Sequence, residues 1–219
     1  GYSNYYFNYA HNCNAGIKKA MEHNPKWIIL SNDDIYKIYD IEILIKELNV
    51  AQEKGIDVAF PEERAKEGVA YRMNLGKTTI IRKIFYLFYS KNTRITLKLE
   101  KKYKIFLGKK FLAVGLNFPY SLFVKGYIKF INGGNFFIFN SKIFEKNYFF
   151  DETYINGFED ADLSLRIKLD NLRIDVLNYK IGGKVGTSLG KHGSLRSLRN
   201  FLNYIYFNYK YEKYDFFRI

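Results

Sequence analysis

The sequence predicts a single α/β domain, residues 1–219, with a mixed, mostly parallel sheet flanked by helices and a basic, aromatic arm. Two short apolar segments, 27–30 and 56–60, stand on either side of a stretch with helical periodicity. Strand, helix and strand in this order form a right-handed crossover between parallel strands. The chain has 219 residues, of which 47% are hydrophobic, and this length suffices for one domain with its own core.

The first expected helix covers residues 14–23. Ile17, Ala20 and Met21 stand at helical spacing behind small polar residues, and Pro25 follows them. Small polar residues are suited to cap a helix, and proline ends one. A short helix therefore precedes the first strand.

Residues 27–30 form a continuous apolar run, which is typical of a parallel strand buried on both faces. From residue 40 to 51 apolar side chains recur at helical spacing, and Gly55 supplies a C-terminal stop. Residues 56–60 form the next expected strand. Ligands of such sheets bind outside the carboxyl ends of the strands, where the polar residues 31–34 lie.

Residues 77–129 form a basic and aromatic insertion, in which lysine and arginine alternate with bulky apolar residues. This mixture suits a surface that lies on an anionic membrane. An arm that covers the core with its charges in solvent fits the same composition.

After the insertion, residues 130–139 are expected to form a buried strand that is interrupted at Gly133 and Gly134. Because glycine has no side chain, this point allows a backbone to approach a ligand closely, or it permits a bulge. The remaining expected elements are a short helix over 141–146, a strand over 173–176 and a C-terminal helix within 194–219, beginning near Leu195.

The chain has 35 Lys and Arg against 22 Asp and Glu, a formal charge of +13. This charge favours anionic partners such as nucleotide diphosphates, acidic lipid headgroups or nucleic acid. A single cysteine, Cys13, allows neither an internal disulfide nor a cysteine-based metal cage, so we expect a reducing, cytoplasmic setting. No apolar run reaches the roughly 18 residues that a membrane-spanning helix needs.

Two acidic clusters could carry chemistry, and the first follows the strand at 27–30. A divalent ion that bridges two phosphates needs hard oxygen ligands, which Asp33 and Asp34 could supply at a rigid strand end. Asn32 or Ser31 could hydrogen-bond a ribose or a metal-bound water. Polar residues of this kind are also common in turns, so an ordinary turn is the alternative.

The second cluster, Glu159, Asp160 and Asp162, crowds the first turn of a predicted helix. Carboxylates are favourable at a helix N-terminus, and Asp162 can pair with Arg166 four residues later. Three acids exceed what capping requires, however. Close carboxylates raise one another's pKa, and in this way a site obtains a base for a hydroxyl nucleophile.

These segments resemble the inverting glycosyltransferases of family 2, which have the Rossmann-like GT-A fold. The most specific match is a phenylalanine-aspartate-glutamate turn, a short spacer, and then glutamate-aspartate, an aspartate, a leucine and an arginine. The residues that carry the resemblance are Asp33 with Asp34, Gly133-Gly134, Phe150-Asp151-Glu152 and the run from Gly157 to Arg166. The segment Asn12-Cys13-Asn14-Ala15-Gly16-Ile17 is similar to the family's helix start ahead of the metal strand.

The resemblance implies that Asp33 and Asp34 bind Mn2+ or Mg2+ and the diphosphate, as in a DxD-type motif. Asp160 would be the general base that deprotonates the acceptor hydroxyl, and Glu159 and Asp162 would bind the acceptor. The implied donor is a nucleotide-activated sugar, whose anomeric centre is inverted in one displacement. The donor site would comprise Asn32, Asp33, Asp34, Gly133, Gly134 and His192, although an exposed loop histidine is the alternative for His192.

The similarity spans roughly residues 4–193 with a divergent middle. Family members normally begin with two strands that bind the nucleoside, and the sequence starts at Gly1 without them. We therefore expect either an N-terminally truncated fragment or a shortened relative. Ser31 also stands where the family often has aspartate, which leaves the ribose contacts open.

The expected acceptor is a glycan or lipid-linked hydroxyl at the cytoplasmic face of the membrane, where the basic arm would contact anionic lipid. Two alternatives remain open. A nucleic-acid-binding protein would use the +13 charge and the aromatic rings, but the cations are spread through the chain without a nucleic-acid motif, so nucleic acid is not the expected partner. A GT-A-like remnant without activity is the other alternative.

Overall fold

A computed structural model describes residues 8–32, 35–38, 40–62, 65–73, 124–132, 136–154 and 157–183, together with Asn203, Tyr206, Phe207, Lys210 and Tyr211. Most of the predicted insertion at 77–129 lies outside these residues. So do five predicted site residues: Asp33, Asp34, Gly133, Gly134 and His192.

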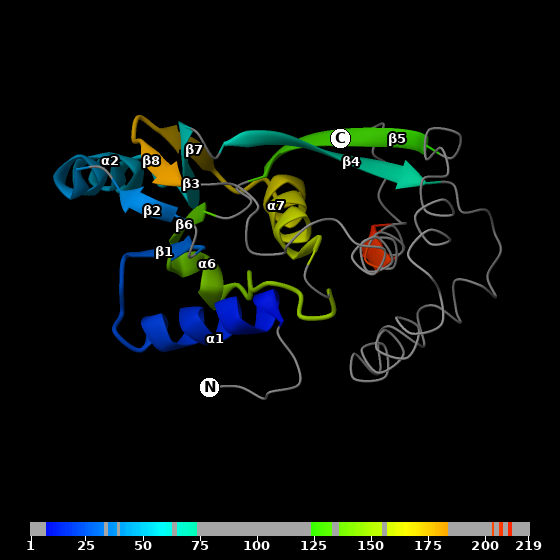
Figure 1. Cartoon of the computed structure of the whole chain (residues 1–219), viewed down its shortest axis with the longest axis horizontal. Helices are drawn as coiled ribbons and strands as arrows, with labels where there is room; N and C mark the ends of the chain where they lie inside the picture. Colours follow the sequence, from blue (N-terminus) through cyan, green and yellow to red (C-terminus); the bar gives the residue numbers. More distant parts are fainter. Residues whose placement is uncertain are drawn as a thin grey trace.

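The described part of the chain contains helices and strands in mixed order (Figure 1). In the first half they are α1 (Tyr9–Met21), β1 (Trp27–Ser31), β2 (Ile35–Ile38), α2 (Ile41–Glu53), β3 (Val58–Pro61) and β4 (Lys66–Met73). In the second half they are β5 (Val124–Asn132), β6 (Phe136–Asn140), α6 (Lys142–Glu145), α7 (Glu159–Leu169), β7 (Ile174–Leu177) and β8 (Ile181–Gly183).

The main sheet has four strands in the order β1-β6-β3-β7. β6 runs antiparallel to β1 and β3, whereas β3 and β7 are parallel. Three strands thus share one direction and β6 opposes them, which confirms a mixed sheet. The pairing within it is mostly antiparallel and not mostly parallel as predicted, because β6 lies between β1 and β3. The predicted crossover joins β1 and β3 through α2, and β6 lies between these two strands.

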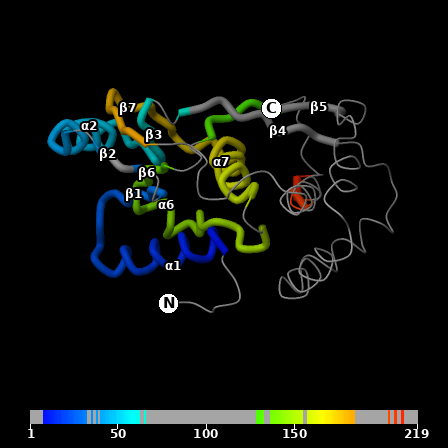
Figure 2. Tube along the Cα trace, viewed as in Figure 1, coloured from blue at the N-terminus to red at the C-terminus, as the bar shows by residue number. Residues whose placement is uncertain are grey.

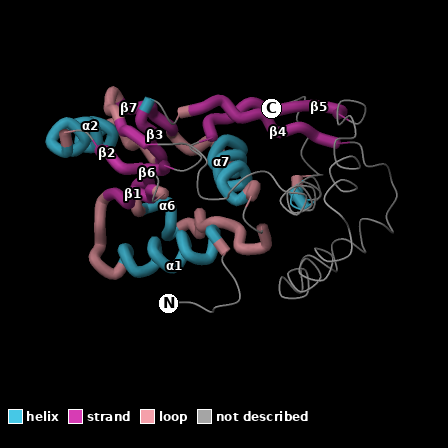
Figure 3. The backbone as a smooth tube through the Cα atoms, in the orientation of Figure 1, coloured by secondary structure: helices cyan, strands magenta, loops and turns pink. Residues whose placement is uncertain are grey.

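Alternate side chains of the sheet face two separate cores. On one face, Phe137 and Phe139 of β6 pack with Ile17 of α1 and Leu163 of α7. On the other face, Ile138 of β6 packs with residues of α2. Successive side chains of a strand point to opposite faces, so helices cover the sheet on both sides, as Figure 3 shows for α1 and α2.

Two small antiparallel pairs complete the described fold. β2 pairs with β8, and β4 pairs with β5 in a longer ribbon. The predicted single strand over 130–139 is therefore wrong, because β5 ends at Asn132 and β6 begins at Phe136 in a different sheet. A third core lies where Phe130 of β5 meets Leu165 of α7 and Phe207.

Two further expectations, the start of α1 and the burial of β1, need correction. α1 begins at Tyr9, earlier than predicted, because the side chain of Asn8 accepts a hydrogen bond from the backbone N–H of His11 at 3.0 Å and caps the helix. β1 stands at the edge of the described sheet and is not buried on both faces, since Ile28 is 6% exposed but Ile29 is 39% exposed.

The other predicted elements agree with the structure. α6 and β7 lie within a residue of their predicted places, and Asn203, Tyr206, Phe207 and Lys210 are helical within the predicted C-terminal helix. None of the helices in the described ranges combines the length and apolar character that crossing a membrane would require.

Candidate functional site

The turn before α7 presents the second acidic cluster. Phe158 has a left-handed backbone with φ 73°, and no side chain caps the helix that follows it. Bulky residues seldom adopt this conformation, and where they do the surroundings must hold them. The Phe158 ring packs 5.7 Å from that of Phe207, and Asn203 Nδ2 donates to the Gly157 carbonyl at 2.7 Å. Residues of the C-terminal helix therefore fix this turn.

The three acids in the first turn of α7 differ in exposure. Asp162 is 0% exposed and Glu159 is 7% exposed. Asp160 keeps part of its surface exposed, although protein atoms surround its carboxyl group densely. Of these three residues, Asp160 has the largest exposed fraction.

Asp160 is surrounded by donors as well as by apolar groups. It accepts a hydrogen bond from the Ala161 N–H at 2.8 Å and another from the side chain of Asn132, the last residue of β5. Burial raises the pKa of Asp160, and these hydrogen bonds offset only part of that rise. A carboxyl group with a raised pKa is a stronger base than an ordinary aspartate.

Glu159 lies near both Asp160 and α1. Burial raises the pKa of Glu159 to about 7, and the charge of Asp160 adds to the rise. The Gly157 N–H donates to Glu159 Oε2 and opposes it. On the α1 side, burial raises the pKa of the Cys13 thiol to about 11, with a further contribution from Glu159. For Glu159, the neighbouring Asp160 carboxylate raises the pKa as expected, but burial is the larger cause. For Asp160, the pKa rises because of burial.

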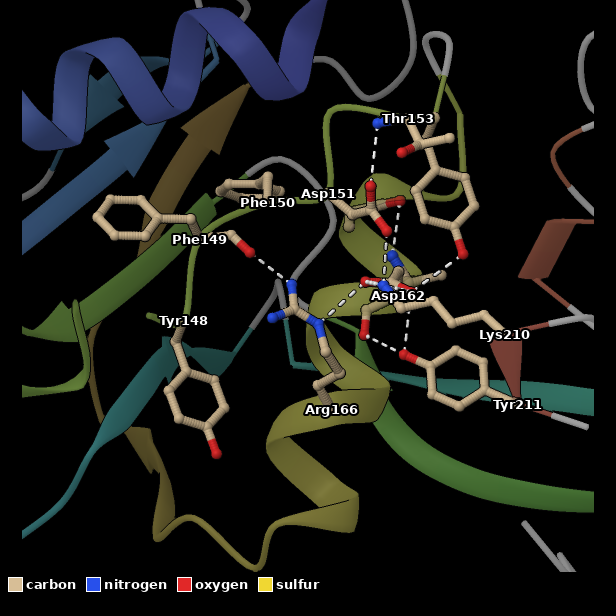
Figure 4. Close-up of polar contacts among 12 residues, drawn as sticks. Tyr148, Phe149, Phe150, Asp151, Thr153, Asp162, Arg166, Lys210 and Tyr211 are labelled. Carbon is tan, nitrogen blue, oxygen red and sulfur yellow. Dashed lines mark hydrogen bonds and ion pairs between the residues drawn. The ribbon is translucent and has the colours of Figure 1, made fainter. Parts of the chain in front are cut away.

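Asp162 has a different environment, which Figure 4 shows. The Tyr154 and Tyr211 hydroxyls donate to its Oδ1 at 3.0 and 2.9 Å, and Arg166 Nε donates to its Oδ2 at 3.0 Å. Lys210 Nζ lies 2.8 Å from Oδ1 and 2.9 Å from Oδ2. The predicted Asp162–Arg166 pair is confirmed. The predicted acceptor contact of Asp162 does not fit, because its carboxylate is fully enclosed and fully bonded.

Lys210 also binds Asp151, the central residue of the phenylalanine-aspartate-glutamate turn. Its Nζ lies 2.7 Å from Asp151 Oδ2, and the Tyr206 hydroxyl donates to the same oxygen at 2.9 Å. Burial alone would raise the pKa of Asp151, but the Lys210 charge and the Thr153 N–H outweigh it and hold the pKa below its usual range. One ammonium group thus joins the turn to α7.

The same turn is held from its other side by α1 (Figure 2). Asn14 Nδ2 donates to the Phe150 carbonyl and to Glu152 Oε1, both at 2.9 Å. Asn8 Nδ2 donates to the Glu152 carbonyl at 3.0 Å, and His11 Nδ1 lies 2.9 Å from Glu152 Oε2. The asparagine-rich helix start and the turn, which were matched separately in the sequence, are therefore in direct contact.

The end of β1 lies toward the same region. Ser31 is paired with Phe136 across the sheet, and Phe136 follows Asn132 by four residues, a span of at most about 14 Å for an extended chain. Asn132 in turn binds Asp160. Asp33 and Asp34 directly follow this strand but lie outside the described residues, so their distance from Asp160 stays a prediction.

The described residues were also considered as metal ligands. Within the described ranges, no three His, Cys, Asp or Glu side chains gather around one point. Asn32 Oδ1 is buried, and no hydrogen-bond partner for it occurs in the described part of the chain. An amide oxygen is a suitable ligand for a hard divalent cation, so Asn32 fits the predicted cation site beside Asp33 and Asp34.

Sequence reasoning missed the side chains that organise this site, which are Asn132, Tyr154, Tyr206, Lys210 and Tyr211. For the C-terminal helix a signal existed. Asn203, Phe207, Lys210 and Tyr211 recur at helical spacing, so an asparagine and a lysine share the face of two aromatic residues. A cation on such a face indicates a buried acid elsewhere.

Comparisons of the chain with protein-family models, with curated proteins and with solved structures found no match.

Proposed function

We propose that this chain is a metal-dependent inverting glycosyltransferase with a GT-A-like fold, similar to family 2, in which Asp160 is the general base. The observation that carries the proposal is the environment of Asp160. Asp160 is the least buried of the three acids in this turn, and burial of its carboxyl group raises the pKa of that group. This is the environment that a base for a hydroxyl group requires.

The fold and the local contacts also support the proposal. The mixed sheet between helices is compatible with the architecture that the resemblance implies. The two segments most specific to the resemblance, Phe150–Glu152 and the start of α7, are joined through Lys210, and the helix start at Asn14 binds the first of them. Three matched segments thus form one structural unit.

In the proposed reaction, Asp160 removes the proton from the acceptor hydroxyl. The hydroxyl oxygen forms a bond to the anomeric carbon of the donor sugar while the bond from that carbon to the diphosphate oxygen breaks, which inverts the centre. Glu159 offers little surface to an acceptor at 7% exposure. The charge of Asp160 instead raises the pKa of Glu159, because like charges disfavour ionisation.

Asn32, Asp33 and Asp34 would hold Mn2+ or Mg2+ and the donor diphosphate. The bound cation would supply positive charge to the diphosphate as it leaves. Gly133, Gly134 and His192 belong to the proposed donor site by the resemblance. The +13 charge and the basic residues of 77–129 support an acceptor that is lipid-linked or lies at an anionic membrane.

The donor class is tested by a thermal-shift panel. Nucleoside diphosphates and their sugars are added to the full chain with and without Mn2+, since a ligand that binds the native state raises Tm. We expect a rise that requires both nucleotide and Mn2+. Single-stranded oligonucleotides are included, and a salt-dependent rise with them alone would favour nucleic-acid binding instead.

The base is tested by Asp160→Asn, with Asp175→Asn as the matched control on β7. Asp160→Asn should lower transfer at least about 100-fold while nucleotide binding with Mn2+ is retained. Asp175→Asn should transfer as the wild type does. Full transfer by Asp160→Asn would show that another group is the base, and binding without turnover by the wild type would indicate an inactive remnant.

A further inference from the structure

We propose that Lys210 is a positioning residue for Asp160: its ammonium group ties the first turn of α7 to the Phe150–Tyr154 loop by bridging Asp151 and Asp162. The inference rests on the proposed function of Asp160. It assigns a role to Lys210, which lies 50 positions after Asp160 in the sequence and whose side chain is 25% exposed.

The first step of the argument is that α7 lacks an ordinary start. No side chain accepts a hydrogen bond from its first turn at the N-cap position, which Phe158 occupies in a left-handed conformation. The acids of the turn bind N–H groups of the turn itself, but these local bonds do not fix its position relative to the rest of the fold. Contacts from outside the helix must supply that.

Asp162 provides these contacts. It stands two residues after Asp160 in the same turn, and its N–H donates to the Phe158 carbonyl at 2.7 Å. Its carboxylate binds Lys210 through both oxygens. Because Lys210 simultaneously binds Asp151 at 2.7 Å, the turn is fixed to a loop that α1 holds from the other side.

The charges of this group balance only when Lys210 is present. Asp151 and Asp162 carry two negative charges, and Lys210 and Arg166 carry two positive charges. The ammonium group also lies over the rings of Tyr154 and Tyr211, at 5.7 and 5.9 Å from their centroids. Without Lys210 a buried excess of negative charge would remain beside Glu159 and Asp160, and repulsion would displace the turn.

The test compares Lys210→Met, Lys210→Arg and the wild type, with Lys54→Met as the matched control. Lys54 forms an ion pair with Asp175 at 3.5 Å on an exposed surface, where it is 59% exposed. Amide hydrogen exchange is measured over residues 157–165 and over α2. Donor KM and kcat are measured well below the Tm of each variant, so that the folded fractions match.

In Lys210→Met we expect exchange over residues 157–165 to become at least about tenfold faster, while α2 exchanges as in the wild type. We expect kcat to fall at least about tenfold with donor KM within about twofold, because donor binding lies elsewhere. Lys210→Arg should recover most of both losses, and Lys54→Met should show neither.

Unchanged exchange over residues 157–165, equal acceleration in α2, or a failure of Lys210→Arg to rescue would each overturn the positioning role. If Lys210→Met does not fold, Tyr211→Phe removes a single hydroxyl from Asp162 and should accelerate exchange in the same segment. The exchange measurement needs no catalysis. An absence of transfer in the wild type would therefore refute the proposed function, while the exchange result would still decide the role of Lys210.

Discussion

Asn14 and Phe150 exchange two hydrogen bonds across 136 positions of sequence. Asn14 Nδ2 donates to the Phe150 carbonyl, and the Phe150 N–H donates to Asn14 Oδ1, each at 2.9 Å. Asn14 is 4% exposed. Its side-chain amide supplies the donor and the acceptor that the Phe150 backbone would otherwise obtain from a neighbouring strand. Through this pair, α1 supports the turn that carries Asp151.

Asn14→Ala should lower the free energy of unfolding by roughly 2–4 kcal/mol, because it leaves the buried N–H and carbonyl of Phe150 without partners. Urea denaturation followed by circular dichroism measures the loss. Asn12→Ala, at an exposed position two residues earlier in α1, is the control and should change stability by less than about 0.5 kcal/mol. A similar small effect of Asn14→Ala would mean that water or another group replaces the amide.

The sequence predicted the elements whose signals are local. The helical spacing of Leu44, Leu48 and Ala51 gives α2, and the predicted strand over 56–60 overlaps β3. The prediction failed where the limits of a strand depend on the strands with which it pairs. In residues 130–139, two apolar runs flank a polar and glycine break, which was interpreted as an interruption within one strand. Pairing with β4 on one side and with β1 and β3 on the other assigns the two runs to different sheets, as β5 and β6.

Asp162→Asn should lower the free energy of unfolding much more than Asp160→Asn, although both replace an aspartate by asparagine within the same turn. Asp162→Asn leaves the Lys210 and Arg166 cations short of a buried counter-charge and should cost roughly 3–5 kcal/mol in the free energy of unfolding. Asp160→Asn should cost less than about 1 kcal/mol at pH 8, since the raised pKa of Asp160 shows that its charge is not favoured. Chemical denaturation of both variants measures the difference.

Asp170→Asn is the control for this pair, because Asp170 is an exposed acid at the other end of the same helix and accepts a hydrogen bond from the Tyr148 hydroxyl at 2.6 Å. Its loss should be about 1 kcal/mol or less. If Asp162→Asn were no worse than this control, the buried charge network would not be what stabilises the start of α7.

The different roles of Asp160 and Asp162 illustrate what a sequence motif can predict. The residues Glu159, Asp160 and Asp162 were identified together, because acids at a helix start have one sequence signature. Which of them is exposed depends on Lys210 and Tyr211, which reach Asp162 from the far end of the chain. Spacing within the motif carries no information about that contact.

Glu159→Gln should make stability less dependent on pH. The pKa of Glu159 is about 7 in the folded chain, against an ordinary value of 4.5, so the folded state binds more protons between these values and wild-type stability falls as pH rises through this window. The glutamine variant avoids this loss. At pH 8 it should be more stable than the wild type by about 3 kcal/mol, and the difference should vanish near pH 4.5.

Denaturation at several pH values measures this difference, with Glu53→Gln as the control at the exposed end of α2. The control should differ from the wild type by the same small amount at every pH. A Glu159→Gln variant that is no more stable at pH 8 than at pH 5, relative to the wild type, would show that the buried carboxyl group does not retain its proton.

Asn132 should set the lower pH limit of transfer. Its side chain donates to Asp160 and lowers the pKa of that group against the effect of burial. Asn132→Ala removes the donor and Asn132→Asp adds a like charge, so the pKa of Asp160 should rise in the first variant and further in the second. Because a protonated carboxyl group cannot accept the acceptor's proton, transfer at the acidic end of the pH range should fall in that order and recover at higher pH. The pH dependence of kcat/KM measures this shift in the pKa of Asp160. Asn49→Ala, on the exposed side of α2, is the control. A loss of transfer that is equal at every pH would indicate that Asn132 acts on the shape of the site and not on the base.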